Sequence, residues 1–205
     1  MKMKKVLITW VLLLVMTLNA CGADTALLGS WKGNFDVTTM VKEIYTPTLL
    51  ASDKAMEKYL QLEGMNVELT FTFTEESFSI SVDEAAKEAL RSSIETALTT
   101  TYNAYMEAKA SKANMKIDAL YAVNATTKEK AIEDFLKGMK VEQVVDVIAT
   151  AFQVSGDYGY DKESITIVYA DDTWEKMKYA LKDGQLTITI QNGEQEVPVV
   201  CEKTE

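Results

Sequence analysis

The sequence VELTFTFTEESFSISV, residues 67–82, contains two runs in which apolar and polar side chains alternate strictly. Apolar residues occupy every second position from Val67 to Phe73 and again from Phe78 to Val82, and Glu75-Glu76 lies between the runs. A period of two places successive side chains on opposite faces of a β-strand. The stretch therefore predicts an antiparallel hairpin with one apolar face and one polar face.

The same period returns in the last third of the chain. Large apolar residues or cysteine occupy every second position over 165–169, 177–181, 186–190 and 197–201. Asp183-Gly184 and Asn192-Gly193 separate the last three of these runs, and both dipeptides are typical of tight hairpin turns. Together with a strand over residues 29–37, which carries Trp31 and Phe35, and a short strand at Tyr158 and Tyr160, the pattern predicts about eight strands.

Between these strands the period changes to that of a helix. Residues 84–111 carry an apolar stripe that starts after Asp83, a residue type that favours helix N-termini. Further amphipathic runs continue to residue 155, so we expect a helical insertion over 84–155 between the third and fourth strands. After the first strand we expect a helix pair, one helix starting at Thr38 or Thr39 and a second starting at Thr46-Pro47. The predicted fold class is α+β: an antiparallel β-barrel or a strongly curved sheet of about eight strands.

The N-terminus has the pattern of an export signal. Lys2, Lys4 and Lys5 precede an apolar run of roughly 13 residues, against the ~20 that a membrane-spanning helix needs. Leu18-Asn19-Ala20-Cys21 resembles the lipobox of bacterial lipoproteins, although Asn19 departs from its usual residues. The resemblance implies a signal peptide over 1–20, lipidation of Cys21, a tether over 21–28 and an extracytoplasmic protein anchored to the cell membrane. Ordinary secretion and a retained helix are the alternatives.

The charge of the chain argues against two classes of partner. Without Lys2, Lys4 and Lys5, the 21 basic residues fall to 18 against 31 acidic ones, a formal charge of −13. Nucleic-acid binding requires a basic footprint, and helices that lie flat on anionic lipid use lysine and arginine. We therefore expect no nucleic-acid partner, and we expect the membrane to be reached through the acyl chains on Cys21. The sequence does not specify a protein partner.

The order of elements also resembles a known family. Gly29-x-Trp31 on the first strand resembles the Gly-x-Trp motif of lipocalins, in which the tryptophan plugs one end of an eight-stranded barrel. The helix pair after the first strand and the hairpin-joined strands at the C-terminus fit a lipocalin-like, calycin-type barrel. The resemblance implies one domain over 29–203 that contains the helical insertion. Lipocalins place an arginine over the tryptophan, whereas the only arginine here, Arg91, lies in a predicted helix. Pro198, which lacks a ladder donor, suggests an edge in the last strand.

The candidate binding residues follow from the apolar faces of the strands. If the barrel holds a small apolar ligand, the side chains that line its cavity are these: Phe71, Phe73, Phe78, Ile80, Met177, Tyr179 and Ile188. The same residues could instead fill an ordinary core. Trp31 is structural under either interpretation.

The sequence offers little support for chemistry. It contains no histidine, which removes Ser-His-Asp and Cys-His catalysis and the commonest zinc sites. The acidic residues between 157 and 172 could hold Ca²⁺, but aspartate also forms turns by default. With Cys21 lipidated, Cys201 has no disulfide partner, and its apolar surroundings suggest a buried thiol. We expect no enzyme activity, no cofactor and no metal.

Two functions remain. The first is a non-catalytic, lipid-anchored binding module of lipocalin type for a small or apolar ligand. The alternative is a structural or interaction protein of the cell envelope, with a filled barrel and a protein partner.

Overall fold

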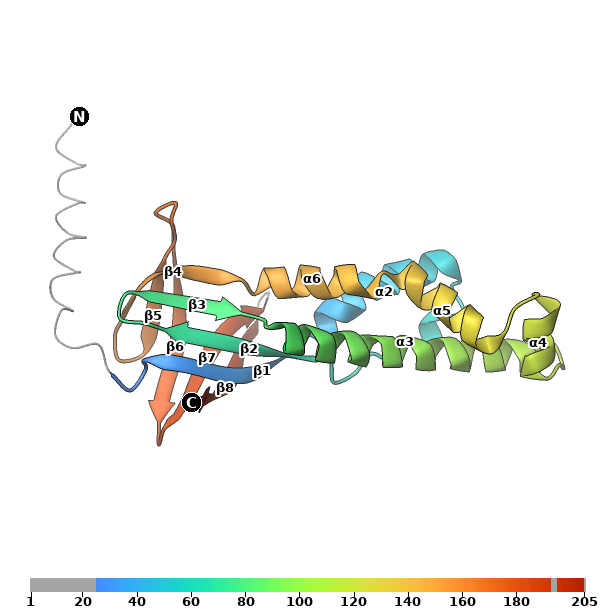
Figure 1. The fold of residues 1–205 in the computed structure, drawn as a ribbon, viewed down its shortest axis with the longest axis horizontal. Coiled ribbons are helices and arrows are strands. Elements are labelled where there is room, and N and C mark those ends of the chain that lie inside the picture. The colour runs from blue at the N-terminus through green and yellow to red at the C-terminus, as the bar shows by residue number, and fades with distance from the viewer. Residues whose placement is uncertain (1–24, 193–194, 205) are drawn as a thin grey trace, which may run out of the picture. The chain divides into compact units, whose positions relative to one another are not determined.

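A computed structural model describes residues 25–192 and 195–204 (Figure 1). Eight strands form a closed antiparallel barrel in sequence order. The strands have these bounds: β1 Gly29–Asp36, β2 Asn66–Phe73, β3 Ser77–Ser81, β4 Val154–Tyr160, β5 Ser164–Val168, β6 Trp174–Lys182, β7 Gln185–Asn192 and β8 Gln195–Thr204. The predicted fold class is confirmed, and of its two alternatives the closed barrel is the one formed.

The hairpin of β2 and β3 has the register that its alternating sequence requires. Phe71 pairs with Ile80 and Phe73 pairs with Phe78, and all four side chains are buried. The turn is closed by Thr74, whose hydroxyl accepts a hydrogen bond from the Ser77 N–H at 2.9 Å. One face of the hairpin is therefore inside the barrel, as predicted.

The barrel closes where β1 pairs with β8. The register runs from Ser30 opposite Thr204 to Gly33 opposite Cys201. Pro198 lies outside this register and pairs only toward β7, opposite Thr189. The N–H that proline lacks is thus not needed for the β1 ladder, which is why Pro198 does not open the sheet.

The described residues form two compact units. The barrel unit contains the described chain up to Asn34, Leu69–Ser81 and the chain from Gln153 onward. The helical unit contains Phe35–Glu68 and Val82–Phe152. Each unit has its own buried apolar core; Phe35 and Phe152 make an edge-to-face contact in the helical unit at 5.0 Å between ring centroids.

Two segments of the chain build the helical unit. The first, after β1, contains α2 (Thr38–Ser52) and a short 3-10 helix, η1 (Glu57–Tyr59). The second, between β3 and β4, contains α3 (Glu84–Lys112), α4 (Ile117–Val123), α5 (Lys128–Met139) and α6 (Val141–Ala151). The insertion is as predicted, except that residues 154 and 155 already belong to β4.

The helix pair after β1 differs from the prediction. α2 continues through Pro47, and the second helix is reduced to the three residues of η1. Val41, Tyr45 and Leu49 are buried at a spacing of four residues, so one apolar stripe crosses the proline. Burial of that stripe outweighs the loss of one backbone hydrogen bond at position 47.

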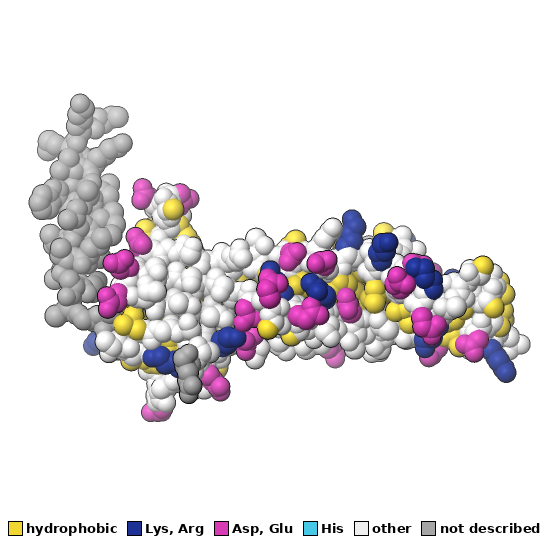
Figure 2. All heavy atoms as spheres, in the orientation of Figure 1, with side chains coloured by type: hydrophobic (Ala, Val, Ile, Leu, Met, Phe, Trp, Pro, Cys, Tyr) yellow, Lys and Arg dark blue, Asp and Glu magenta, His cyan; other side chains and the backbone are white. Residues whose placement is uncertain are grey.

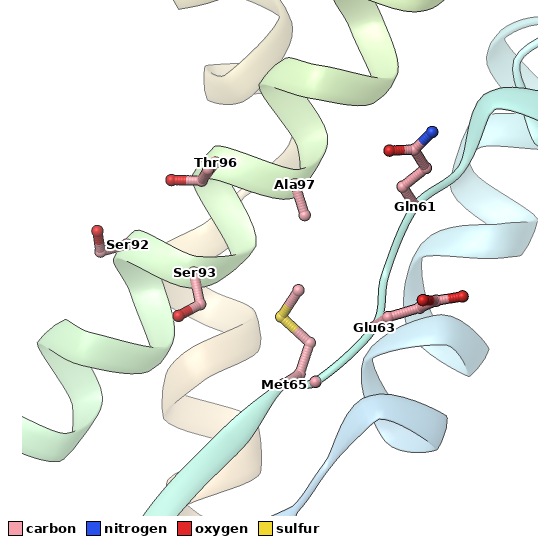
Figure 3. A pocket seen from close by; sticks show the side chains of 8 residues that line it. Gln61, Glu63, Met65, Ser92, Ser93, Thr96 and Ala97 are labelled. Carbon is pink, nitrogen blue, oxygen red and sulfur yellow. The ribbon is translucent and has the colours of Figure 1, made fainter.

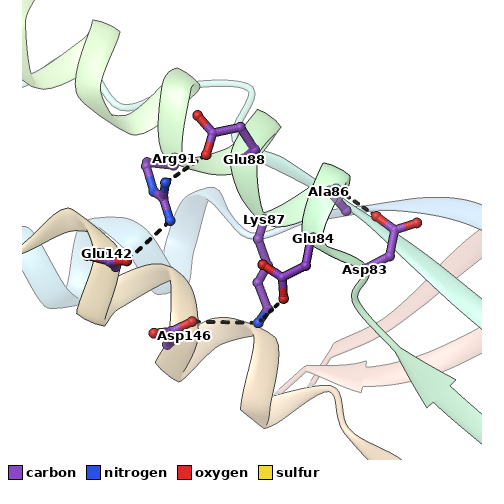
Figure 4. A network of polar contacts seen from close by, with 8 residues as sticks. All are labelled: Asp83, Glu84, Ala86, Lys87, Glu88, Arg91, Glu142 and Asp146. Atoms are coloured by element: carbon purple, nitrogen blue, oxygen red, sulfur yellow. Dashed lines mark hydrogen bonds and ion pairs between the residues drawn. The ribbon is translucent and has the colours of Figure 1, made fainter.

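Charged side chains connect α3 to α6 (Figure 4). Asp83 caps α3 by accepting the Ala86 N–H at 2.8 Å. Lys87 lies 2.9 Å from Glu84 and 3.7 Å from Asp146 of α6. Arg91, the only arginine, lies 2.7 Å from Glu88 and 3.7 Å from Glu142 of α6. These exposed pairs orient the two helices, and each contributes at most about 1 kcal/mol to stability.

Candidate binding site

The seven residues predicted to line a cavity lie on four strands of the barrel. Phe71, Phe73, Phe78, Ile80, Met177 and Ile188 are between 0 and 6% exposed. Tyr179 is half-buried, and its hydroxyl donates a 2.8 Å hydrogen bond to the backbone oxygen of Asp161. Their inward orientation follows from the alternation, while their role as a cavity wall stays a prediction.

Aromatic rings inside the barrel pack against one another. The ring centroids of Phe73 and Phe78 lie 4.8 Å apart, and those of Phe73 and Tyr158 lie 5.6 Å apart in an edge-to-face arrangement. At Gly33, an added Cβ atom would lie 2.7 Å from Val199 Cγ1 and 2.8 Å from the backbone oxygen of Val200. At these positions the barrel interior is in contact with the chain's own atoms.

Trp31 is a buried residue near the start of β1, and its role as a barrel plug stays a prediction. It is 1% exposed, and its indole N–H donates a 2.8 Å hydrogen bond to the backbone oxygen of Leu27. Lys203 lies over the ring, with its Nζ atom 5.2 Å from the centroid. A lysine of β8 therefore makes a cation–π contact with the tryptophan, which the sequence did not suggest.

The helical unit contains a pocket of about 670 Å³ that sequence reasoning missed (Figure 3). One wall is the chain between η1 and β2, with Gln61, Glu63, Gly64 and Met65, and the other is α3. The α3 side is lined by Ser92, Ser93, Thr96 and Ala97. Met65 and Ala97 point into the space between the walls, whereas Glu63 and Thr96 point away from it. The pocket thus has an apolar floor, with Met65 and Ala97 4% and 9% exposed, and a polar rim.

Hydrogen bonds fix the first wall at both ends. The Gln61 N–H donates to Thr101 Oγ1 of α3 at 3.3 Å, and the Met65 N–H donates to Thr38 Oγ1 of α2 at 2.9 Å. The Met65 oxygen accepts from the Val37 N–H at 2.8 Å. Gly64, between these anchors, has a φ of +64°, a left-handed conformation that glycine adopts without strain. The wall is therefore a preformed turn.

The acidic turns of the barrel use their carboxylates locally. Asp161 accepts hydrogen bonds from the Glu163 and Ser164 N–H groups, which hold the pKa of its carboxyl well below the usual range. Asp171 accepts from the Thr173 N–H at 3.0 Å. Within residues 25–192 and 195–204, no group of three or more histidine, cysteine or acidic side chains could hold a metal ion. These aspartates stabilise turns.

The structure describes one of the two cysteines. Cys201 is a free, fully buried thiol, and burial raises its pKa to about 12. Cys21 and the export segment lie outside the described residues. No helix in the described part of the chain is both long and apolar enough to cross a membrane.

Comparison with known proteins yields no family model, no curated protein and no solved structure that matches this chain.

Proposed function

We propose that this chain is a lipid-anchored lipoprotein of the bacterial cell envelope that binds a small molecule without transforming it. The binding site is the pocket between residues 61–65 and α3, and the bound molecule places an apolar group against Met65 and Ala97.

One contrast supports this choice of site. The interior of the barrel is in contact with its own side chains around Phe73 and Gly33, whereas the helical pocket leaves about 670 Å³ in front of two buried apolar side chains. Ligand sites are typically concave, and polar groups in them fix the orientation of the ligand. Five of the eight residues that line this pocket have polar side chains. Ser93 and Gln61 offer such groups at the rim.

The absence of histidine supports binding rather than catalysis. Without histidine, a serine or cysteine nucleophile would need a different base, and Cys201 is buried with a raised pKa. The role proposed here requires none of these groups.

The anchor is tested by the substitution Cys21→Ala in cells. The unmodified protein is expected in the membrane fraction, and Cys21→Ala is expected in the soluble envelope fraction with its signal segment removed. The wild-type protein is the control for cleavage, checked by the mass of the mature chain. Retention of a cleaved Cys21→Ala protein in membranes would contradict a lipid anchor at this residue.

The binding site is tested by native mass spectrometry of protein purified from its own envelope. A small molecule is expected to co-purify with the wild-type protein. Ser93→Trp, which adds bulk beside Met65, should abolish the adduct, whereas Ser111→Trp should retain it. Ser111 is a matched control because it is also an exposed serine of α3 but lies outside the pocket. An adduct that survives Ser93→Trp, or none with the wild type, would contradict the proposal.

A further inference from the structure

The end of the helical unit that holds α4 and α5 has a charge opposite to that of the rest of the protein. We call residues 109–140, from the last turn of α3 to the C-cap of α5, the distal segment. It contains seven lysines and four acidic residues, a formal charge of +3. The rest of the chain after residue 20 then carries −16. Such segregation marks a local electrostatic surface that the total charge conceals.

Most of the lysines of the distal segment are available to a partner. Lys130 is paired with Glu133 at 3.3 Å and with Asp134 at 2.8 Å, and Lys109 lies over the Tyr105 ring. Within the described residues, no ion pair involves the remaining five lysines of the segment: Lys112, Lys116, Lys128, Lys137 and Lys140. Because two of the four acids are already used by Lys130, the available charge of the segment is predominantly positive.

The distal segment also exposes apolar side chains. Val123 is 73% and Met115 is 36% exposed. On α5, the stripe of Ile132, Phe135 and Leu136 is only half-buried, and Met139 is the one buried residue of the described helix. Figure 2 shows yellow apolar and dark-blue lysine side chains together at this end of the helical unit. An amphipathic helix normally buries such a stripe; here the Phe135 ring stacks on Tyr102 of α3 with 4.6 Å between centroids, and the stripe stays partly exposed.

We propose that the distal segment is a docking surface for an anionic lipid bilayer. Lysines with apolar neighbours suit this partner, because ammonium groups approach the headgroups while apolar side chains enter the boundary with the acyl chains. A soluble polyanion would use the lysines but would leave Val123 and Met115 in water. The observation that favours a bilayer is therefore the combination of charge and exposed apolar area.

The acidic residues at the N-terminal end of α3 lie far from this contact. α3 has 29 residues, which at ~1.5 Å per residue places Glu84 and Glu88 roughly 35–40 Å from the end of the helix. Exposed charges are screened beyond about 8–10 Å at physiological salt. A headgroup at the distal segment is therefore screened from Glu84 and Glu88.

Sedimentation with vesicles tests the surface without the lipid anchor. The chain from residue 21 to 205, carrying Cys21→Ala, is mixed with vesicles of phosphatidylglycerol or of phosphatidylcholine. We expect sedimentation with phosphatidylglycerol only, and release of the protein at about 0.5 M NaCl because the screening length falls to a few ångströms. Failure of the small-molecule proposal would leave this result unchanged, since the pocket is not involved.

Paired substitutions separate this surface from a general effect of charge or hydrophobicity. Val123→Asp should weaken vesicle binding, whereas Val147→Asp, at a valine of α6 that is 62% exposed, should not. Lys116→Gln should weaken binding about fivefold, and Lys182→Gln on β6 should have no effect. All four positions are exposed, so each variant should fold.

Three results would overturn the proposal. The first is no sedimentation of the unmutated protein with phosphatidylglycerol, and the second is equal sedimentation with both lipids. The third is binding to inorganic polyphosphate as tight as to vesicles with no effect of Val123→Asp. That last result would assign the lysines to a soluble polyanion.

Discussion

Gly33 shows at the scale of one residue how closely the barrel is packed. Its place on the inward face of β1 leaves no room for a side chain, since a Cβ atom would meet both the side chains and the backbone of β8. Gly138 in α5 is the opposite case, because nothing lies within 4 Å of an added Cβ. Close packing requires a glycine at position 33, whereas no contact requires one at position 138.

Replacing each glycine by alanine separates these reasons. Gly33→Ala should lower the free energy of unfolding by about 1–3 kcal/mol through overpacking. Gly138→Ala should raise it by about 0.5–1 kcal/mol, because alanine loses less conformational entropy in a helix. Urea denaturation measures both values. An equal effect of the two substitutions would mean that the approach of β8 to Gly33 is not a close contact.

Cys201 makes stability depend on pH in the alkaline range. Burial raises the pKa of its thiol from 9.0 to about 12, so the folded protein retains a proton that the unfolded chain loses above pH 9. The stabilising effect is complete below pH 9 and is lost as the pH rises toward 12. The free energy of unfolding should then fall by at most about 1.4 kcal/mol per pH unit.

Urea denaturation between pH 8.5 and 10 measures this dependence. Cys201→Ala should flatten it, because alanine does not ionise. Tyr105 and Tyr169, with pKa values raised to about 12 from 10.0, contribute only at higher pH. An equally steep dependence in Cys201→Ala would assign the effect to another group.

At the scale of elements, Thr101 connects the turn before β2 to α3. Its side chain is fully buried, donates to the Ala97 oxygen at 2.9 Å and accepts from the Gln61 N–H. The neighbouring Thr100 is exposed and donates to the Thr96 oxygen at the same distance. The hydrogen bonds to Ala97 and Thr96 lie within α3. The hydrogen bond from the Gln61 N–H reaches Thr101 from outside the helix and holds the wall of the pocket.

A pair of isosteric substitutions isolates that bond. Thr101→Val should cost about 1–3 kcal/mol, because the Gln61 N–H loses its partner in a partly buried place. Thr100→Val should change stability by less than about 0.5 kcal/mol. Hydrogen exchange at the Gln61 amide should accelerate only in Thr101→Val. Unchanged exchange there would show that the turn does not depend on this threonine.

Elements with a strong local pattern could be predicted from the sequence. The period of two is enough to predict the hairpin of residues 67–82. Asp83 before an apolar stripe is enough to predict the start of α3. The continuation of α2 through Pro47 could not be predicted in this way, because local chemistry favours a break and tertiary burial of Tyr45 and Leu49 prevents it.

Features that depend on distant parts of the chain were not predictable. The contact of Lys203 with Trp31 exists only once β8 pairs with β1. The pocket combines a short irregular turn around Gly64 with small and polar residues of α3, none of which forms a motif in the sequence. The sequence predicts the strands, and the ligand site was expected on them because their alternating aromatic residues are the clearest apolar pattern in the chain.

For the whole molecule, the order of segments along the chain divides it between a barrel unit and a helical unit. Two segments of the chain, one after β1 and one after β3, form the helical unit, and the other segments form the barrel unit. A barrel that is filled by its own side chains would leave ligand binding to the helical unit. A barrel that contains a ligand would instead leave part of its interior unpacked.

The substitution Phe73→Ala distinguishes these two barrels most directly. Phe73 is 2% exposed, and its ring contacts those of Phe78 and Tyr158. In a filled barrel, its removal should lower the free energy of unfolding by the ~3–5 kcal/mol typical of a buried phenylalanine, and the unmutated protein should take up no apolar fluorescent probe. A loss well below ~3 kcal/mol, together with probe uptake by the unmutated protein that Phe73→Ala reduces, would contradict the filled barrel and return the ligand site to its interior.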